Sequence, residues 1–203
     1  MIVIKNKPYN SIWVKADSQV ELGNTFIRFQ EYYESPNPDF RNKIFTLGQV
    51  RNWYSIKYGC DSYHNDWIGF NFPSKVLDPF RQGLFDPLTN EEKILLELLK
   101  YRYDNFYIIG AQDDSVLRHE LAHALYGYSK KYAQSIDTII KLHKKDLQKI
   151  IKYILDKGYD ISVVNDEIQA YITDNDDKYI LENTPKHIIN KIIQTYNKYN
   201  NLN

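Results

Sequence analysis

The sequence predicts a single α+β domain, residues 1–203, in which a small β-sheet precedes a helical half. A length of 203 residues is enough for one domain with a full hydrophobic core. Residues 1–112 hold nearly all the prolines, all three tryptophans and most of the phenylalanines, in short segments typical of strands and loops. Residues 113–200 instead carry apolar residues at helical spacing. We therefore expect a sheet-bearing first half and a helical second half.

Several short segments of the first half predict β-strands. Residues 1–6 (MIVIKN) and 11–16 (SIWVKA) owe their apolar character to β-branched and aromatic residues, and they predict a hairpin. In residues 66–72 (DWIGFNF), large apolar residues alternate from Ile68 onward, as they do in a strand. Residues 105–110 (NFYIIG) predict a strand that leads directly into the helical half.

Helix signals stand between these strands. The segment from Thr46 to Gly59 predicts a helix, with the threonine as N-cap and the glycine as stop. Residues 88–102 predict another, because Glu91 and Glu92 would lie in its first turn, near the positive end of the helix dipole.

The second half predicts a succession of helices, the first of which can be capped by Asp113, Asp114 and Ser115. Residues 144–158 place an apolar stripe on one face and end at a glycine; the stripe is Leu147, Ile150, Ile151, Ile154 and Leu155. Residues 184–199 begin with a Thr-Pro start signal, and their apolar stripe is Ile188, Ile189, Ile192, Ile193 and Tyr196.

The charge balance excludes several classes of partner. Lys+Arg and Asp+Glu both total 26, so the net charge is zero and gives no basis for binding nucleic acid or an acidic membrane surface. No apolar stretch is long enough to span a bilayer, and lysine and asparagine interrupt the N-terminal segment before it can act as a signal peptide. Cys60 is the only cysteine, which excludes an intrachain disulfide and a zinc site made of thiolates. We expect a soluble protein of the reducing cytoplasm.

The segment Ser115–Gly127 (SVLRHELAHALYG) carries the clearest chemical signal. Its His119 and His123 are four residues apart, with Glu120 beside the first. Residues at this spacing share one face of a helix, so both imidazoles can point at one metal ion. A ridge at the same spacing on the opposite side would anchor the helix in the core, and it consists of Leu117, Leu121 and Leu125.

A catalytic zinc needs a third protein ligand, and Glu167 is the best choice. A helix capped by Ser162 would carry Glu167 beside an apolar stripe, with no lysine of the same helix one turn away. A carboxylate in such a place is costly to bury unless a cation meets it. The stripe consists of Val164, Ile168 and Ile172.

The rival ligands are less well placed. Asp166 would lie toward a polar face with Ser162 and Gln169. His143 and His187 are on lysine-rich helices, where a histidine is more often solvated or hydrogen-bonded than bound to a metal.

The His-Glu-x-x-His pattern resembles the zincin metallopeptidases, in which it binds the catalytic zinc. The metzincin continuation would require a glycine and a histidine where this chain has Tyr126 and Ser129, and it would require a Met-turn although Met1 is the only methionine. The gluzincin pattern, with a glutamate on a later helix followed by a small and a polar residue, is similar to Glu167 with Ala170 and Tyr171.

One departure from the gluzincin pattern concerns the partner of a zinc histidine. Tyr171 stands near the place of the aspartate that would orient such a histidine. Ligating histidines normally donate their second ring proton, so an acceptor is still expected, and Asp174 is a candidate.

The resemblance implies a zinc-dependent peptidase that acts on peptide or protein substrates. Zn²⁺ would be held by His119, His123 and Glu167, with Glu120 as general base. Tyr171 is the catalytic residue we favour for stabilising the oxyanion. The alternatives, which the sequence does not rank, are Tyr126, Tyr128 and His143.

Substrate peptides of zincins pair with an edge strand, which residues 66–72 would supply, with Gly69 allowing close approach. Equally, Trp67, Phe70 and Phe72 could be core residues and Gly69 a bulge. Two other functions remain as alternatives: a zincin-like domain that binds zinc without proteolysis, as a binding or regulatory module, and a helical interaction protein in which the motif is coincidental.

Overall fold

The computed structural model describes residues 3–102 and 104–200, and the chain divides into two compact units, Met1–Leu117 and Arg118–Asn203. The first unit carries the sheet and the second is helical, so the predicted α+β class with an N-terminal sheet and a helical C-terminal half is confirmed. Whether the chain behaves as one domain stays a prediction. None of the helices in the described ranges combines the length and the apolar character that a bilayer span requires.

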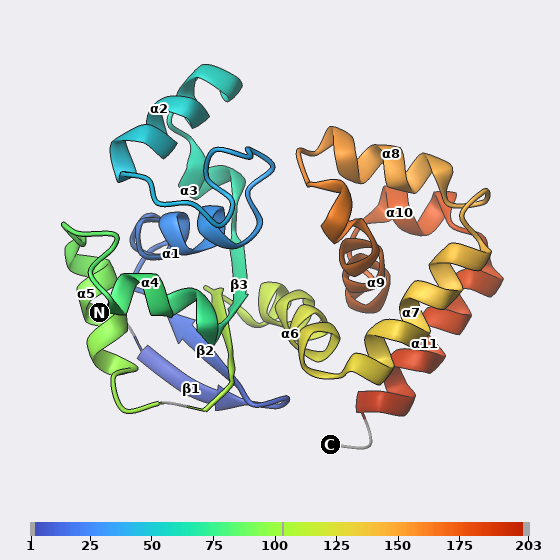
Figure 1. The fold of residues 1–203 in the computed structure, drawn as a ribbon. Helices are drawn as coiled ribbons and strands as arrows, with labels where there is room; N and C mark the ends of the chain where they lie inside the picture. The colour runs from blue at the N-terminus through green and yellow to red at the C-terminus, as the bar shows by residue number, and fades with distance from the viewer. Residues whose placement is uncertain (1–2, 103, 201–203) are drawn as a thin grey trace. The chain divides into compact units, whose positions relative to one another are not determined.

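The sheet of the first unit contains all the strands that the sequence predicts. β1 (Val3–Lys7) and β2 (Ser11–Lys15) form the expected antiparallel hairpin. β4 (Tyr107–Ala111) pairs parallel to β2 and antiparallel to β3 (Gly69–Pro73). The order β1-β2-β4-β3 makes β3 an edge strand, and Figure 1 shows it in teal.

β3 has five residues and is therefore shorter than the predicted strand, residues 66–72. Its pairing shows whether Gly69 forms a bulge. Gly69 pairs with Ala111 and the register continues without interruption to Pro73, so Gly69 is not a bulge. Phe70 and Phe72 are fully buried, which confirms them as core residues.

Helix α1 (Gln19–Glu34) was not predicted from the sequence, and it supplies Leu22, Phe26, Ile27 and Phe29 to the core of the first unit. Ser18 caps it by accepting a hydrogen bond from the backbone N–H of Glu21. Phe26 stacks on Phe70 of β3 with 5.2 Å between ring centroids. Its ring also requires Gly110, since a Cβ atom there would lie 2.8 Å from the ring.

Shorter helices complete the first unit. Those predicted from the sequence are α2 (Leu47–Tyr58), which has a capping box at Thr46, and α5 (Asn90–Leu98), capped by Thr89. Gly59 follows α2 in the left-handed conformation, as its role as a stop requires. Three short elements were not predicted from the sequence: α3 (Tyr63–Asp66), the 3-10 turn Ser74–Leu77, and α4 (Asp78–Arg81).

Helix α6 (Asp114–Tyr128) begins at the end of the first unit and continues into the second. It is followed by α7 (Lys130–Leu142), α8 (Gln148–Asp156), α9 (Val164–Asp174), α10 (Lys178–Asn183) and α11 (Lys186–Asn200). Within the second unit α9 packs against α7, α8, α10 and α11, and Figure 1 shows it beside α8 and α10. Its central position buries most of its side chains.

One predicted helix start is wrong. Ser162 does not cap α9, because it lies inside a 3-10 turn, Ile161–Val163, whose cap is Asp160. The Asp160 carboxylate accepts from the backbone N–H of Ser162, and α9 itself begins at Val164 without a side-chain cap.

Candidate metal centre

Helix α6 presents its two histidines on one face, as their spacing predicts. The carboxylate of Asp113 accepts hydrogen bonds from the backbone N–H groups of Ser115 and Val116, which fixes the start of the helix. The Nε2 atoms of His119 and His123 lie 3.1 Å apart. On the leucine ridge, Leu117 and Leu125 are buried as expected, whereas Leu121 is only half-buried.

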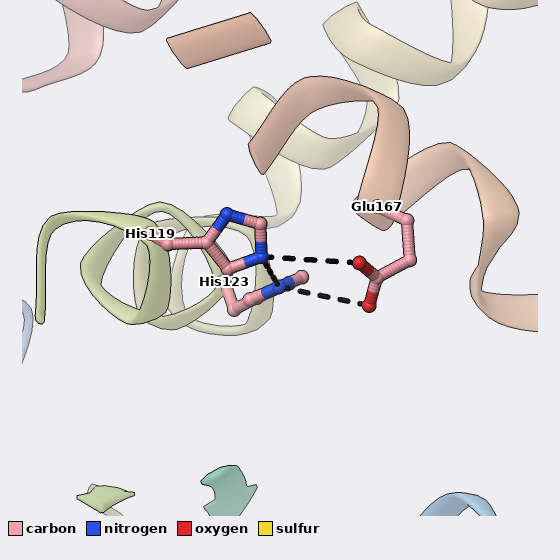
Figure 2. Close-up of side chains that lie close together, drawn as sticks. All are labelled: His119, His123 and Glu167. Carbon is pink, nitrogen blue, oxygen red and sulfur yellow. Dashed lines mark hydrogen bonds and ion pairs between the residues drawn. The ribbon is translucent and has the colours of Figure 1, made fainter. Parts of the chain in front are cut away.

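Glu167 reaches these histidines from α9, as Figure 2 shows. Its Oε1 is 3.7 Å from Nε2 of His123, and its Oε2 is 3.9 Å from Nε2 of His119. One ligand atom from each residue lies within 4.8 Å of the others, and Glu167 and His123 are buried. The residues predicted as metal ligands therefore form a group that could hold a metal ion.

The geometry of this group fits a small divalent cation. Ligand atoms about 2.0–2.1 Å from a tetrahedral zinc are about 3.3 Å apart. The observed separations between 3.1 and 3.9 Å lie around that value. In addition, Oε2 of Glu167 is buried without a hydrogen-bond partner. Such an atom costs about 1–3 kcal/mol unless it is satisfied, and a cation would satisfy it.

Asp166 lies beside Gln169, as predicted, but it also contacts His123 instead of pointing away from the histidines. Its Oδ1 lies 2.9 Å from Nδ1 of His123, and its side chain is only 20% exposed. Gln169, expected on the same polar face, is fully buried and hydrogen-bonded to Tyr132. Because α9 is surrounded by other helices, side chains that look solvent-directed in the sequence meet protein groups instead.

Asp174 lies next to the other histidine, in agreement with its candidacy as an acceptor. Its Oδ2 is 4.0 Å from Nδ1 of His119, and its Oδ1 is 3.7 Å from Nε of Arg118. A separation of 4.0 Å exceeds that of a hydrogen bond. Each histidine thus has an aspartate of α9 on its Nδ1 side. Only Asp166 is within hydrogen-bond distance of its histidine, His123.

Carboxylates dominate the electrostatics around His123. Burial by itself would lower the pKa of this imidazole, but the charges of Asp166, Glu167 and Glu120 outweigh burial and raise the pKa well above its usual value. Without a metal these carboxylates therefore favour a proton on His123. A metal ion would take the place of that proton.

The two residues predicted to be catalytic lie beside this group. Glu120 is buried, and its charge adds to those of Asp166 and Glu167, which outweigh burial and raise the pKa of His123. The ring of Tyr171 meets that of His119 edge-on, with 4.7 Å between centroids. The hydroxyl of Tyr171 lies 3.2 Å from that of Tyr159, a half-buried neighbour that was not predicted and for which the sequence offers no signal.

The other residues considered for stabilising the oxyanion contact different groups or face solvent. The hydroxyl of Tyr126 donates to Asp137 over 2.6 Å, and Tyr128 is exposed. Nε2 of His143 lies 3.2 Å from the ammonium group of Lys191.

A second group, His143, Asp146 and His187, could also hold a metal. The ammonium of Lys191 meets His143, and both Asp146 and His187 are exposed, so this is a weaker candidate.

No protein-family description, curated protein or solved structure matches this chain. The site must therefore be interpreted from its own chemistry.

Proposed function

We propose that the protein is a zinc-dependent peptidase of the gluzincin type. The observation that carries the proposal is the buried group of two imidazoles and one carboxylate, in which Oε2 of Glu167 has no other partner. A His-His-Glu ligand set that leaves a coordination position free is typical of catalytic rather than structural zinc. The convergence of Glu167 with both histidines also argues against a coincidental motif, because α6 and α9 are far apart in sequence.

The residues around this group can divide the chemistry of amide hydrolysis between them. When bound, zinc would acidify a water molecule and polarise the substrate carbonyl. Glu120 takes a proton from the water as its oxygen adds to the carbonyl carbon, and it gives that proton to the amine as the C–N bond breaks. Tyr171, next to His119, donates a hydrogen bond to the carbonyl oxygen as negative charge develops there.

The edge strand β3 is the proposed docking place for an extended peptide substrate. A peptide could add to this edge as a further strand through main-chain hydrogen bonds, although the backbone N–H of Asn71 already donates to Oε1 of Gln30 over 3.3 Å.

The test of the proposed function is the substitution Glu120→Gln. Wild-type protein purified without chelator should hold about one zinc per chain. The variant should keep this zinc, while peptide hydrolysis falls roughly 10²- to 10⁴-fold because the proton acceptor is missing. Glu182→Gln, at an exposed position of α10, is the matched control and should retain full activity.

Two outcomes would contradict the proposed function. Equal hydrolysis by wild type and Glu120→Gln would exclude Glu120 as the base. Wild-type protein with full zinc that cleaves no member of a diverse peptide library would instead indicate a zinc-binding module without proteolytic activity.

A further inference from the structure

A chain of hydrogen bonds, buried at Tyr132 and part-buried at Asp166, leads from α7 to His123. The hydroxyl of Tyr132 on α7 donates to Oε1 of Gln169 over 2.7 Å. Nε2 of Gln169 donates to Oδ1 of Asp166 over 2.8 Å. The same Oδ1 lies 2.9 Å from Nδ1 of His123. Tyr132 and Gln169 are both fully buried, so this chain runs through the interior of the second unit.

The amide of Gln169 fits this place in one orientation only. Its NH₂ group can only donate, and it meets the carboxylate of Asp166, which accepts. Turning the amide over would place its oxygen against that carboxylate, and two acceptors repel each other. The hydroxyl of Tyr132 on the other side supplies the donor that the amide oxygen needs. Both ends of the buried amide are therefore satisfied, and Asp166 is held from the side opposite His123.

The position of Asp166 in turn determines which nitrogen of His123 is available. Oδ1 of Asp166 accepts from Nδ1, so the hydrogen lies on Nδ1. Nε2 is then the nitrogen with the lone pair, and it is the one that faces His119 and Glu167.

We infer that Gln169, itself fixed by Tyr132, is a positioning residue of the metal centre: it holds the Asp166 carboxylate against Nδ1 of His123. The inference rests on the proposed binding of zinc but not on peptidase activity. Hydrogen-bond partners one step beyond a metal ligand typically contribute 10- to 100-fold to affinity. Gln169 acts one step further out, through Asp166, and its side chain is fully buried.

The experiment compares zinc affinity in wild type and Gln169→Leu, by competition with a chromogenic chelator below the melting temperature of every variant. Leucine keeps the volume but removes the donor, so we expect zinc to bind roughly 10-fold more weakly. Tyr132→Phe removes only the hydroxyl at the far end of the chain and should weaken binding a few-fold. It also serves as the test if Gln169→Leu does not fold.

Asn165→Leu is the matched control. Asn165 is on the same helix and donates to Asp137 over 2.9 Å, outside the chain that ends at His123. Its replacement should lower stability but leave the affinity for zinc unchanged.

A double substitution separates positioning from a general structural effect. If Gln169 acts through Asp166, then Gln169→Leu should cause no further loss of zinc affinity once Asp166 is alanine. If the losses of zinc affinity in Gln169→Leu and Asp166→Ala are additive, the inference is wrong. It is also wrong if the wild type binds zinc and both Gln169→Leu and Tyr132→Phe bind it equally well. Either result would leave the proposed function standing. Wild-type protein that binds no zinc would overturn both the inference and the proposed function.

Discussion

At the scale of single residues, His123 has carboxylates on two sides of its ring. Asp166 meets Nδ1, Glu167 lies near Nε2, and the charge of Glu120 also reaches the imidazole. One imidazolium cannot neutralise three carboxylates, two of which are buried, so negative charge remains in excess. A divalent cation would reduce this excess, which gives the site an electrostatic reason to bind one.

The substitutions Glu167→Ala and Asp166→Ala should both weaken zinc binding, to different degrees. Glu167→Ala removes a ligand and should abolish stoichiometric zinc. Asp166→Ala removes only the acceptor for His123 Nδ1 and should weaken binding roughly 10- to 100-fold. Adjacent residues on a helix point about 100° apart, so these two carboxylates reach different sides of the histidine. Zinc content after dialysis and affinity by competition measure the difference.

The melting temperature of Glu167→Ala relative to wild type should depend on whether metal is present. In chelator, Glu167→Ala should have a melting temperature equal to or above that of wild type, because an unpaired buried carboxylate oxygen is removed. With zinc, the same variant should melt below wild type. A variant that loses equal stability in both conditions would show that Glu167 has a structural role and is not a ligand.

At the scale of elements, α9 supplies the acidic residues that face the two histidines within the described part of the chain, apart from Glu120 on α6. Glu167 and Asp174 are seven residues apart, which is nearly two helical turns, so they lie on the same face one above the other. Asp166 lies beside them and reaches His123. A rotation of α9 about its axis would remove ligand and acceptors together, so the packing of α9 against its neighbours sets the geometry of the site.

The start of α6 should depend on pH through Asp113. Hydrogen bonds from Ser115 and Val116 lower the pKa of this carboxyl below its usual value. A depressed folded-state pKa means that the stabilisation is present above about pH 4 and is lost as pH falls through the lower folded value. Asp113→Ala should therefore destabilise by about 1 kcal/mol at pH 7 and by much less at pH 3.

Urea unfolding followed by far-UV circular dichroism, with chelator at both pH values, measures this effect. An equal loss at pH 3 and pH 7 would mean that the cap does not depend on ionised Asp113.

A buried ion pair connects α1 to the start of α5. Nε of Arg28 donates to Oε1 of Glu92 over 2.7 Å, and both side chains are almost fully buried. Glu92 also closes the capping box of α5 by accepting from the backbone N–H of Thr89. Glu92→Ala would leave the guanidinium group buried without its counter-ion, so we expect a loss of about 3–5 kcal/mol.

Tryptophan fluorescence during urea unfolding is the measurement for Glu92→Ala, since all three tryptophans lie in the first unit. Glu97→Ala is the matched control on the same helix: its ion pair with Lys100 is exposed, and its effect should stay within about 0.5 kcal/mol. Similar losses for the two variants would contradict a special role of the buried pair.

At the scale of the whole molecule, the tryptophans, whose fluorescence reports unfolding, and the metal ligands belong to different units. Trp13, Trp53 and Trp67 belong to Met1–Leu117, whereas His119, His123 and Glu167 belong to Arg118–Asn203. Removing zinc should therefore lower the thermal transition seen by circular dichroism of the helices more than the transition seen by tryptophan fluorescence. Equal shifts of both transitions would show that the two units unfold together as one cooperative domain.

The sequence by itself determined the features that depend on local pattern. Alternating and helical apolar spacing predicted the strands of the sheet and the helices of the second half, because each element must bury one face. The cap at Thr46 was predictable because its side chain bonds to the backbone only three residues away. The spacing of His119 and His123 predicted that both would share one face of α6, for the same local reason.

Only the tertiary structure decided the features that depend on which elements meet. Helix α1 was not predicted, because its sequence includes Gly23, Asn24 and Thr25, which are weak helix formers, and its burial against the sheet overrides them. Asp166 and Gln169 were assigned to a polar face of their helix, since the sequence does not show that α7 and α11 pack around α9. Polarity alone does not tell whether a side chain faces water or a buried partner, so the acceptor of His123 and the chain behind it became visible only in the packed fold.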